Sequence, residues 1–151
     1  MKPFLSLVIA LLFTAPMSFA EETVTSETDA AWSEISTLES ENLNDFLWQA
    51  RPVVVFADSE ADPRFEQQMA LLKEGALALQ ERDVVILVDT NPANSSALRK
   101  ALRPRGFMLA LIGKDGGVKL RKASPWNARE LSRVIDKFPM RQREVRERRE
   151  P

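Results

Sequence analysis

The chain has 151 residues, with 22 acidic and 21 basic side chains, and it contains neither cysteine nor histidine. Without a thiolate it is excluded from disulfide exchange and from cysteine-based peroxidase chemistry. It also lacks the ligands that transition metals prefer, so we expect no metal site and no cofactor. The near-neutral balance hides an asymmetry, because residues 21–98 have a net charge of −12 and residues 99–151 a net charge of +10. Either the basic half forms a face for an anionic partner, or the two halves neutralise each other in the fold.

Residues 1–20 have the features of a secretory signal peptide. Lys2 supplies a positive start, an apolar run follows at residues 5–13, and Ser18-Phe19-Ala20 has small residues at the two positions that define a cleavage site. The apolar run is too short to span a bilayer. We therefore predict cleavage between Ala20 and Glu21, and a periplasmic or secreted product with no transmembrane segment.

Residues 21–42 are acidic, rich in serine and threonine, and poor in large apolar side chains. This composition is typical of a flexible leader. Trp32, Ile35 and Leu38 nevertheless have the spacing of one helical turn that would be able to dock on a core. A short amphipathic helix is predicted directly after the leader, before the first strand.

Three apolar runs, at residues 53–57, 84–88 and 107–112, show no alternation with polar side chains. That pattern is typical of central strands that are covered by helices on both faces. Residues 118–121 alternate between apolar and basic side chains, as an edge strand does. The glycine-rich segment 113–117 predicts a hairpin turn between the last two strands.

Three helices are predicted between and after these strands. Each begins at a side chain that can accept a hydrogen bond from the first turn: Asp62, Ser95 or Ser96, and Asn127. Gly75 is expected to divide the first helix, and Pro139 is expected to end the last one. The charged residues 141–151 are then a C-terminal tail.

The order of elements over residues 53–137 is that of a thioredoxin-like domain. Four segments carry a more specific resemblance, and they are residues 53–64, 81–84, 106–121 and 135–141. On these residues the chain resembles the family called domain of unknown function 4174, over about residues 43–146. The resemblance implies an α/β, thioredoxin-like three-layer sandwich at residues 43–140. Its central mixed sheet would have about four strands and an antiparallel C-terminal hairpin. The family has no established function.

Two places are candidate binding sites. In redox relatives, the thiol lies in the loop that leaves the first strand, so the resemblance places a site in the loop Asp58–Arg64, with Ser59 and Arg64 as polar contacts. A basic cluster near the end of the second helix is a candidate anion site, and it consists of Arg99, Lys100, Arg103 and Arg105. The alternative is structural: the acids of the loop and the cations of the cluster each complement a helix dipole.

The sequence therefore favours an exported thioredoxin-like module without thiol chemistry, which binds a protein or an anionic polymer of the envelope. Nucleic acid is a poor partner for an exported protein with a net negative charge. Two alternatives stay open. One is an enzyme that uses the carboxylates of the loop Asp58–Arg64 for acid–base chemistry. The other is an accessory protein to a partner that supplies the thiol.

Overall fold

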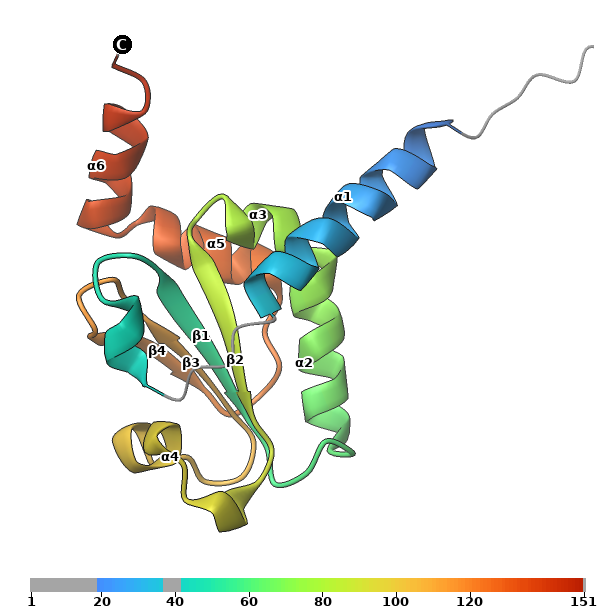
Figure 1. Ribbon diagram of the computed structural model, residues 1–151, viewed down its shortest axis with the longest axis vertical. Coiled ribbons are helices and arrows are strands. Elements are labelled where there is room, and N and C mark those ends of the chain that lie inside the picture. Colours follow the sequence, from blue (N-terminus) through green and yellow to red (C-terminus); the bar gives the residue numbers. More distant parts are fainter. Residues whose placement is uncertain (1–18, 37–41, 151) are drawn as a thin grey trace, which may run out of the picture.

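The computed structural model describes residues 19–36 and 42–150 of the chain (Figure 1). A four-stranded sheet with the order β2-β1-β3-β4 lies at its centre. Strand β1 (Arg51–Phe56) pairs in parallel with β2 (Val84–Asp89) and antiparallel with β3 (Met108–Ile112). Strand β4 (Val118–Lys122) pairs antiparallel with β3 and forms one edge. The other edge is β2, so the apolar run at residues 84–88 is not the central strand that its pattern predicts, and its Val88 is exposed. The predicted mixed sheet with an antiparallel C-terminal hairpin is confirmed.

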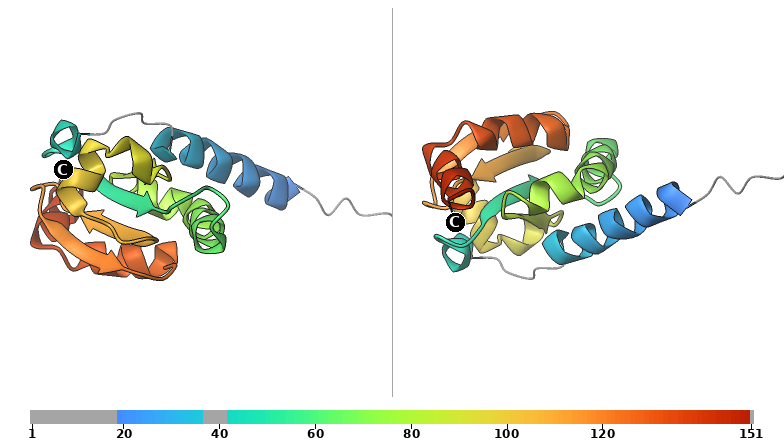
Figure 2. Two further views of the ribbon diagram at one scale, coloured as in Figure 1. Left: turned by 90° about the horizontal axis from the view of Figure 1, so that it is seen from below. Right: turned by 90° about the horizontal axis from the view of Figure 1, so that it is seen from above.

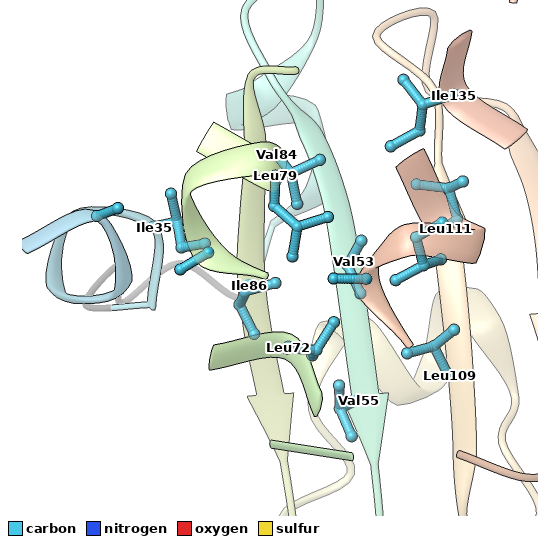
Figure 3. Packing of buried hydrophobic residues seen from close by; sticks show 14 of the residues in the cluster. Ile35, Val53, Val55, Leu72, Leu79, Val84, Ile86, Leu109, Leu111 and Ile135 are labelled. Carbon is cyan, nitrogen blue, oxygen red and sulfur yellow. The ribbon is translucent and has the colours of Figure 1, made fainter. Parts of the chain in front are cut away.

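The central strands are apolar throughout because both faces of the sheet are covered. Side chains alternate between the faces, so Val53 and Val55 of β1 enter one buried cluster while Val54 and Phe56 enter the other. The larger cluster, shown in Figure 3, contains side chains from the sheet and from the helices α1 (Phe19–Ser36), α2 (Pro63–Glu74), α3 (Ala76–Gln80) and α5 (Ala128–Asp136). The short helices η1 (Leu43–Phe46) and α4 (Ala97–Leu102) cover the opposite face.

The predicted helix starts are present. The carboxylate of Asp62 accepts a hydrogen bond from the backbone N–H of Arg64 at the start of α2. The hydroxyl of Ser96 caps α4 after the short helix η2 (Pro92–Asn94), and the Asn127 side chain caps α5. Gly75 separates α2 from α3. It also lets α5 come close, because a Cβ at this position would lie 2.2 Å from the Cβ of Ala128.

At the N-terminal end, a helix occupies much of the segment in which the sequence predicts a flexible leader. In α1, Ala31 and Ile35 are buried against the core, and the earlier turns extend away from the domain (Figure 2). The predicted cleavage point lies at the first turn of α1 and stays a prediction. The rest of the predicted signal peptide, residues 1–18, and Leu38 lie outside the described residues. None of the described helices combines the length and the apolar character needed to cross a membrane.

At the C-terminal end, the residues expected to form a tail continue the fold. Pro139 takes the first position of a further helix, α6 (Pro139–Glu147), where its missing N–H is not needed. Arg141 of this helix is buried and Glu144 is largely so. The tail is helical and docked because its charges find partners on the sheet, which are described below.

Candidate functional site

The loop between β1 and α2 lies where thiol-based relatives would carry their reactive group. Its side chains Asp58, Ser59 and Glu60 are exposed. Asp62 and Arg64 form a two-point ion pair, with Oδ1–Nε and Oδ2–Nη2 distances of 3.2 and 2.9 Å. The guanidinium of Arg64 also lies 5.5 Å from the centre of the Phe107 ring. The charges of Asp62 and Arg64 are therefore paired with each other, and Asp62 also caps the start of α2.

The electrostatics of the loop favour a structural role. Hydrogen bonds from the side chain and the backbone of Arg64 lower the pKa of Asp62 below its ordinary value. A carboxyl group that donates a proton near neutral pH needs a raised pKa instead. The lowered pKa favours the charged form of Asp62 as the helix cap. The backbone N–H of Asp62 donates to the carbonyl oxygen of Ser59 at 3.3 Å.

The predicted basic cluster does not form one site. Arg99 is largely buried and binds the carboxylate of Asp89 with an Nε–Oδ1 distance of 2.8 Å. Its Nη2 also donates to the carbonyl oxygens of Ala57 and Asp89, so it joins α4 to the ends of β1 and β2. Lys100, Arg103 and Arg105 are exposed around it. Arg99 is consequently occupied by the fold, whereas the other three cations are available on the surface.

A second group of charges lies at the opposite end of the sheet, where β1 begins. Arg51 is 1 % exposed, and its Nη2 donates to Oε1 of Glu144 in α6 at 2.9 Å. Lys114 of the β3–β4 turn contacts the same Oε1 at 2.9 Å and Asp83 Oδ2 at 2.8 Å. Arg51, Asp83, Lys114 and Glu144 are called the ionic cluster below. It joins four segments that are remote in the sequence.

The ionic cluster lowers the pKa of its Glu144 carboxyl group. Burial by itself raises the pKa of Glu144, but hydrogen bonds and charge from Arg51 and Lys114 outweigh it, so the pKa is lowered overall. A further cation of α6, Arg141, is 8 % exposed and lies 3.6 Å from Glu144 and 3.7 Å from Asp136. Within the part of the chain that the structure describes, its Nε and Nη1 have no hydrogen-bond partner. Oε2 of Glu144 also has no hydrogen-bond partner among the described residues, so Arg141 and Glu144 face each other beyond hydrogen-bond distance.

A cavity of about 260 Å³ opens beside the ionic cluster, between the β3–β4 turn and the start of α6. We call it the basic pocket, and its lining residues are Arg51, Gly113, Lys114, Asp115, Lys119, Phe138, Pro139, Met140 and Arg143. Four of these are cations and one is an acid. The volume lies just below that of typical small-molecule sites, and it suits one side chain or a small anion.

The walls of the basic pocket differ in how they are held. Lys119 pairs with Asp115 at 2.9 Å, which lowers the pKa of that acid, and its Nζ lies 5.9 Å from the centre of the Phe138 ring. Arg143 is exposed, and no ion pair ties it to the described residues. The first turn of α6 adds backbone N–H groups, because Phe138 provides no side-chain cap. The pocket thus combines cations held by ion pairs, one exposed cation without an ion pair to the described residues, and an apolar wall.

Sequence reasoning missed this pocket, although it singled out parts of its wall. The Gly113–Gly117 turn and the Pro139–Arg141 segment belong to the runs on which the family resemblance rests, and the pocket is where they meet. Arg51, a cation directly before a buried apolar run, was a further signal. Nothing in the sequence alone pairs these segments with one another.

Comparison with known proteins agrees with the fold. The model of the family described as "Domain of unknown function (DUF4174)" matches residues 42–144. A solved structure of Plasmodium yoelii Prx1a, described as modified at the N-terminus and forming an artifactual octamer, superposes with a TM-score of 0.52. It is 14 % identical, and the match covers 67 % of this chain and 80 % of that one, so this likeness shows the fold alone. The chain belongs to the DUF4174 family, and its domain has a thioredoxin-like fold without cysteine.

Proposed function

We propose that this protein is an exported binding module without chemistry of its own, and that its basic pocket receives an anionic group of a protein or other envelope component. One observation carries the proposal: four cations line a single cavity. Asp83, Glu144 and Asp115 pair with three of them, and among the described residues Arg143 has no ion pair. Export is supported by the signal-like first 20 residues.

The basic pocket is organised before any ligand arrives. Glu144 holds the side chains of Arg51 and Lys114 in place, so a ligand does not have to order them. Binding then avoids the entropy that immobilising long side chains would cost. Arg143 is free to close on an anion, and the N-terminal end of α6 adds its positive dipole end. These features favour an anion over a cation or a neutral ligand.

Binding is favoured over acid–base catalysis by the titration of the carboxyl groups. Among the described residues, each carboxyl group with a clearly shifted pKa is shifted downward, and these groups are Asp62, Asp89, Asp115, Asp136 and Glu144. A carboxylate pair that works as acid and base needs one pKa raised and the other low. A lowered pKa instead suits a carboxylate in a structural ion pair. Asp89 forms such a pair with Arg99, and Glu144 forms one with Arg51.

The proposal is tested by titrating the mature chain with inorganic phosphate and following backbone amide signals by NMR. We expect the largest shifts at the β3–β4 turn and the start of α6. The variant Lys119→Gln/Arg143→Gln should weaken phosphate binding about tenfold or more, a change of about 1.4 kcal/mol. The matched control Lys100→Gln/Arg103→Gln removes two charges from α4 and should bind as the wild type does. Equal loss in both variants, or shifts centred on α4, would contradict the pocket as the site.

Export is tested separately from binding. Intact mass of the protein recovered from the periplasmic fraction should correspond to a chain that begins at Glu21. A product that retains Met1 in the membrane fraction would contradict the proposed cleavage.

A further inference from the structure

An exposed tryptophan follows η1, and its backbone is hydrogen-bonded to a residue that lines the basic pocket. Trp48 is 68 % exposed, and its backbone has a φ of +64°. That left-handed conformation disfavours any residue with a Cβ and is usually taken by glycine or asparagine. Burial in the core therefore does not account for this side chain, and the backbone at this position opposes it.

The position of Trp48 is fixed relative to the pocket. Its backbone N–H donates to the carbonyl oxygen of Lys114 at 2.8 Å, and Lys114 lines the pocket. The preceding Leu47 packs against the same turn, since a Cβ on Gly116 would lie 2.9 Å from Leu47 Cδ2. Three residues after Trp48, Arg51 also lines the pocket. The indole is thus attached to the segment that forms the pocket wall.

A large aromatic side chain that is exposed, and held at a strained backbone position, indicates an interaction surface. Strained residues persist where function selects them, and tryptophan is the residue type most enriched among those that dominate binding energy. Val118, which follows the same turn at the start of β4, is also exposed and enlarges the apolar surface of this hairpin. This part of the protein surface therefore has the basic pocket and, outside its lining, the exposed apolar side chains of Trp48 and Val118.

We propose that the ligand is an acidic segment of a partner protein, in which one carboxylate enters the basic pocket and a neighbouring apolar side chain packs on Trp48. This rests on the proposed function and specifies its ligand. A free phosphate or a carbohydrate carboxylate would contact the cations of the pocket but would make no apolar contact with the indole of Trp48. A lipid surface would present a flat array of headgroups, whereas this site is a single cavity of side-chain size with Asp115 in its wall. Charge complementarity and shape both fit a protein segment.

The test uses the peptides Glu-Glu-Leu-Glu-Glu and Glu-Glu-Gly-Glu-Glu, with inorganic phosphate as the simple anion. In a variant that retains Trp48 alone, Trp32→Phe/Trp126→Phe, the leucine peptide should shift the Trp48 emission to shorter wavelength. By the NMR titration described above, it should bind the wild type about tenfold more tightly than the glycine peptide. Trp48→Ala should remove this difference and leave phosphate binding unchanged, and Trp48→Phe should keep most of it.

The outcomes separate the two proposals. If phosphate and both peptides bind the pocket equally and Trp48→Ala changes nothing, the peptide proposal fails while the anion-binding function stands. If no anion perturbs the pocket signals, the proposed function itself fails. Vesicles containing phosphatidylglycerol serve as the third probe. If they shift the Trp48 emission and the leucine peptide does not, the surface binds membranes and the peptide proposal is overturned.

Discussion

Replacing Glu144 with glutamine removes the carboxylate that Arg51 and Lys114 share, while the size of the side chain is kept. Removing one partner of a buried ion pair costs about 3–5 kcal/mol, because the other charge stays buried without its counter-ion. In the variant, Arg51 still has two partners, the carbonyl oxygen of Arg82 at 2.9 Å and the carboxylate of Asp83 at 3.8 Å. Glu144 itself is 18 % exposed, so the pair is not fully buried. We therefore expect the lower end of this range, about 3 kcal/mol.

Urea unfolding followed by circular dichroism measures the loss directly. The matched control is Glu147→Gln, an exposed carboxylate in the same helix, which should change the free energy of unfolding by less than about 0.5 kcal/mol. Truncation after Arg141 also deletes Glu144, so it should cost at least as much as Glu144→Gln. Exposed ion pairs at a free tail would contribute little, and a truncated chain as stable as the wild type would refute the role given to α6.

Glu144→Gln should also change how the free energy of unfolding depends on pH. The pKa of Glu144 is lowered in the folded chain from its ordinary value of 4.5, so its contribution to stability is fully present above that pH. The contribution is lost as the pH falls through the lowered pKa. The stability difference between wild type and Glu144→Gln should thus narrow in acid. A difference that stays constant from neutral pH to the acid transition would show that Glu144 is not held charged by the cluster.

Four further changes test the core, the helix contact, the loop and the exposed indole, each by the same denaturant melts. Leu111→Ala should cost about 2–5 kcal/mol, because this side chain of β3 is fully buried. Gly75→Ala should cost about 1–3 kcal/mol, since the new methyl group overlaps Ala128 and forces α5 away; a neutral result would mean that the two helices separate freely. Asp62→Ala should cost about 1 kcal/mol by removing the cap of α2, and leave phosphate binding intact; lost binding without a change in the melt would make the loop the site. Trp48→Gly should leave stability unchanged or raise it by up to about 1 kcal/mol, because glycine accepts the positive φ; a clear loss would show that the indole supports the fold.

Much of the fold could be predicted because it depends on local patterns. Uninterrupted apolar runs marked β1, β2 and β3, and single side chains such as Asp62 and Asn127 marked the helix starts. The two ends of the chain were harder. The acidic composition of α1 predicts a flexible leader. Its Ala31 and Ile35 are buried against the core, but the sequence alone does not show the surface on which they dock.

The basic pocket could not be predicted for a related reason. Its walls come from the start of β1, the β3–β4 turn and α6, and each segment is ordinary when taken alone. Lys114 has the appearance of a turn residue, and Arg143 that of a solvated tail residue. In contrast, the candidate cluster around Arg99 was read from neighbours in the sequence, and its central cation is used to join α4 to the sheet.

The pairing of Arg51 with Glu144 also bears on when this chain can fold. The two residues are 93 positions apart, and β1 lies inside the sheet, so a central strand has its nearer counter-charge in α6. Contacts between remote segments form late, because the entropy of closing the loop is lost before they contribute. A nascent chain that lacks α6 should therefore stay short of the native state. Such a late closing step would suit the export proposed above, because the fold would stay incomplete until α6 has emerged.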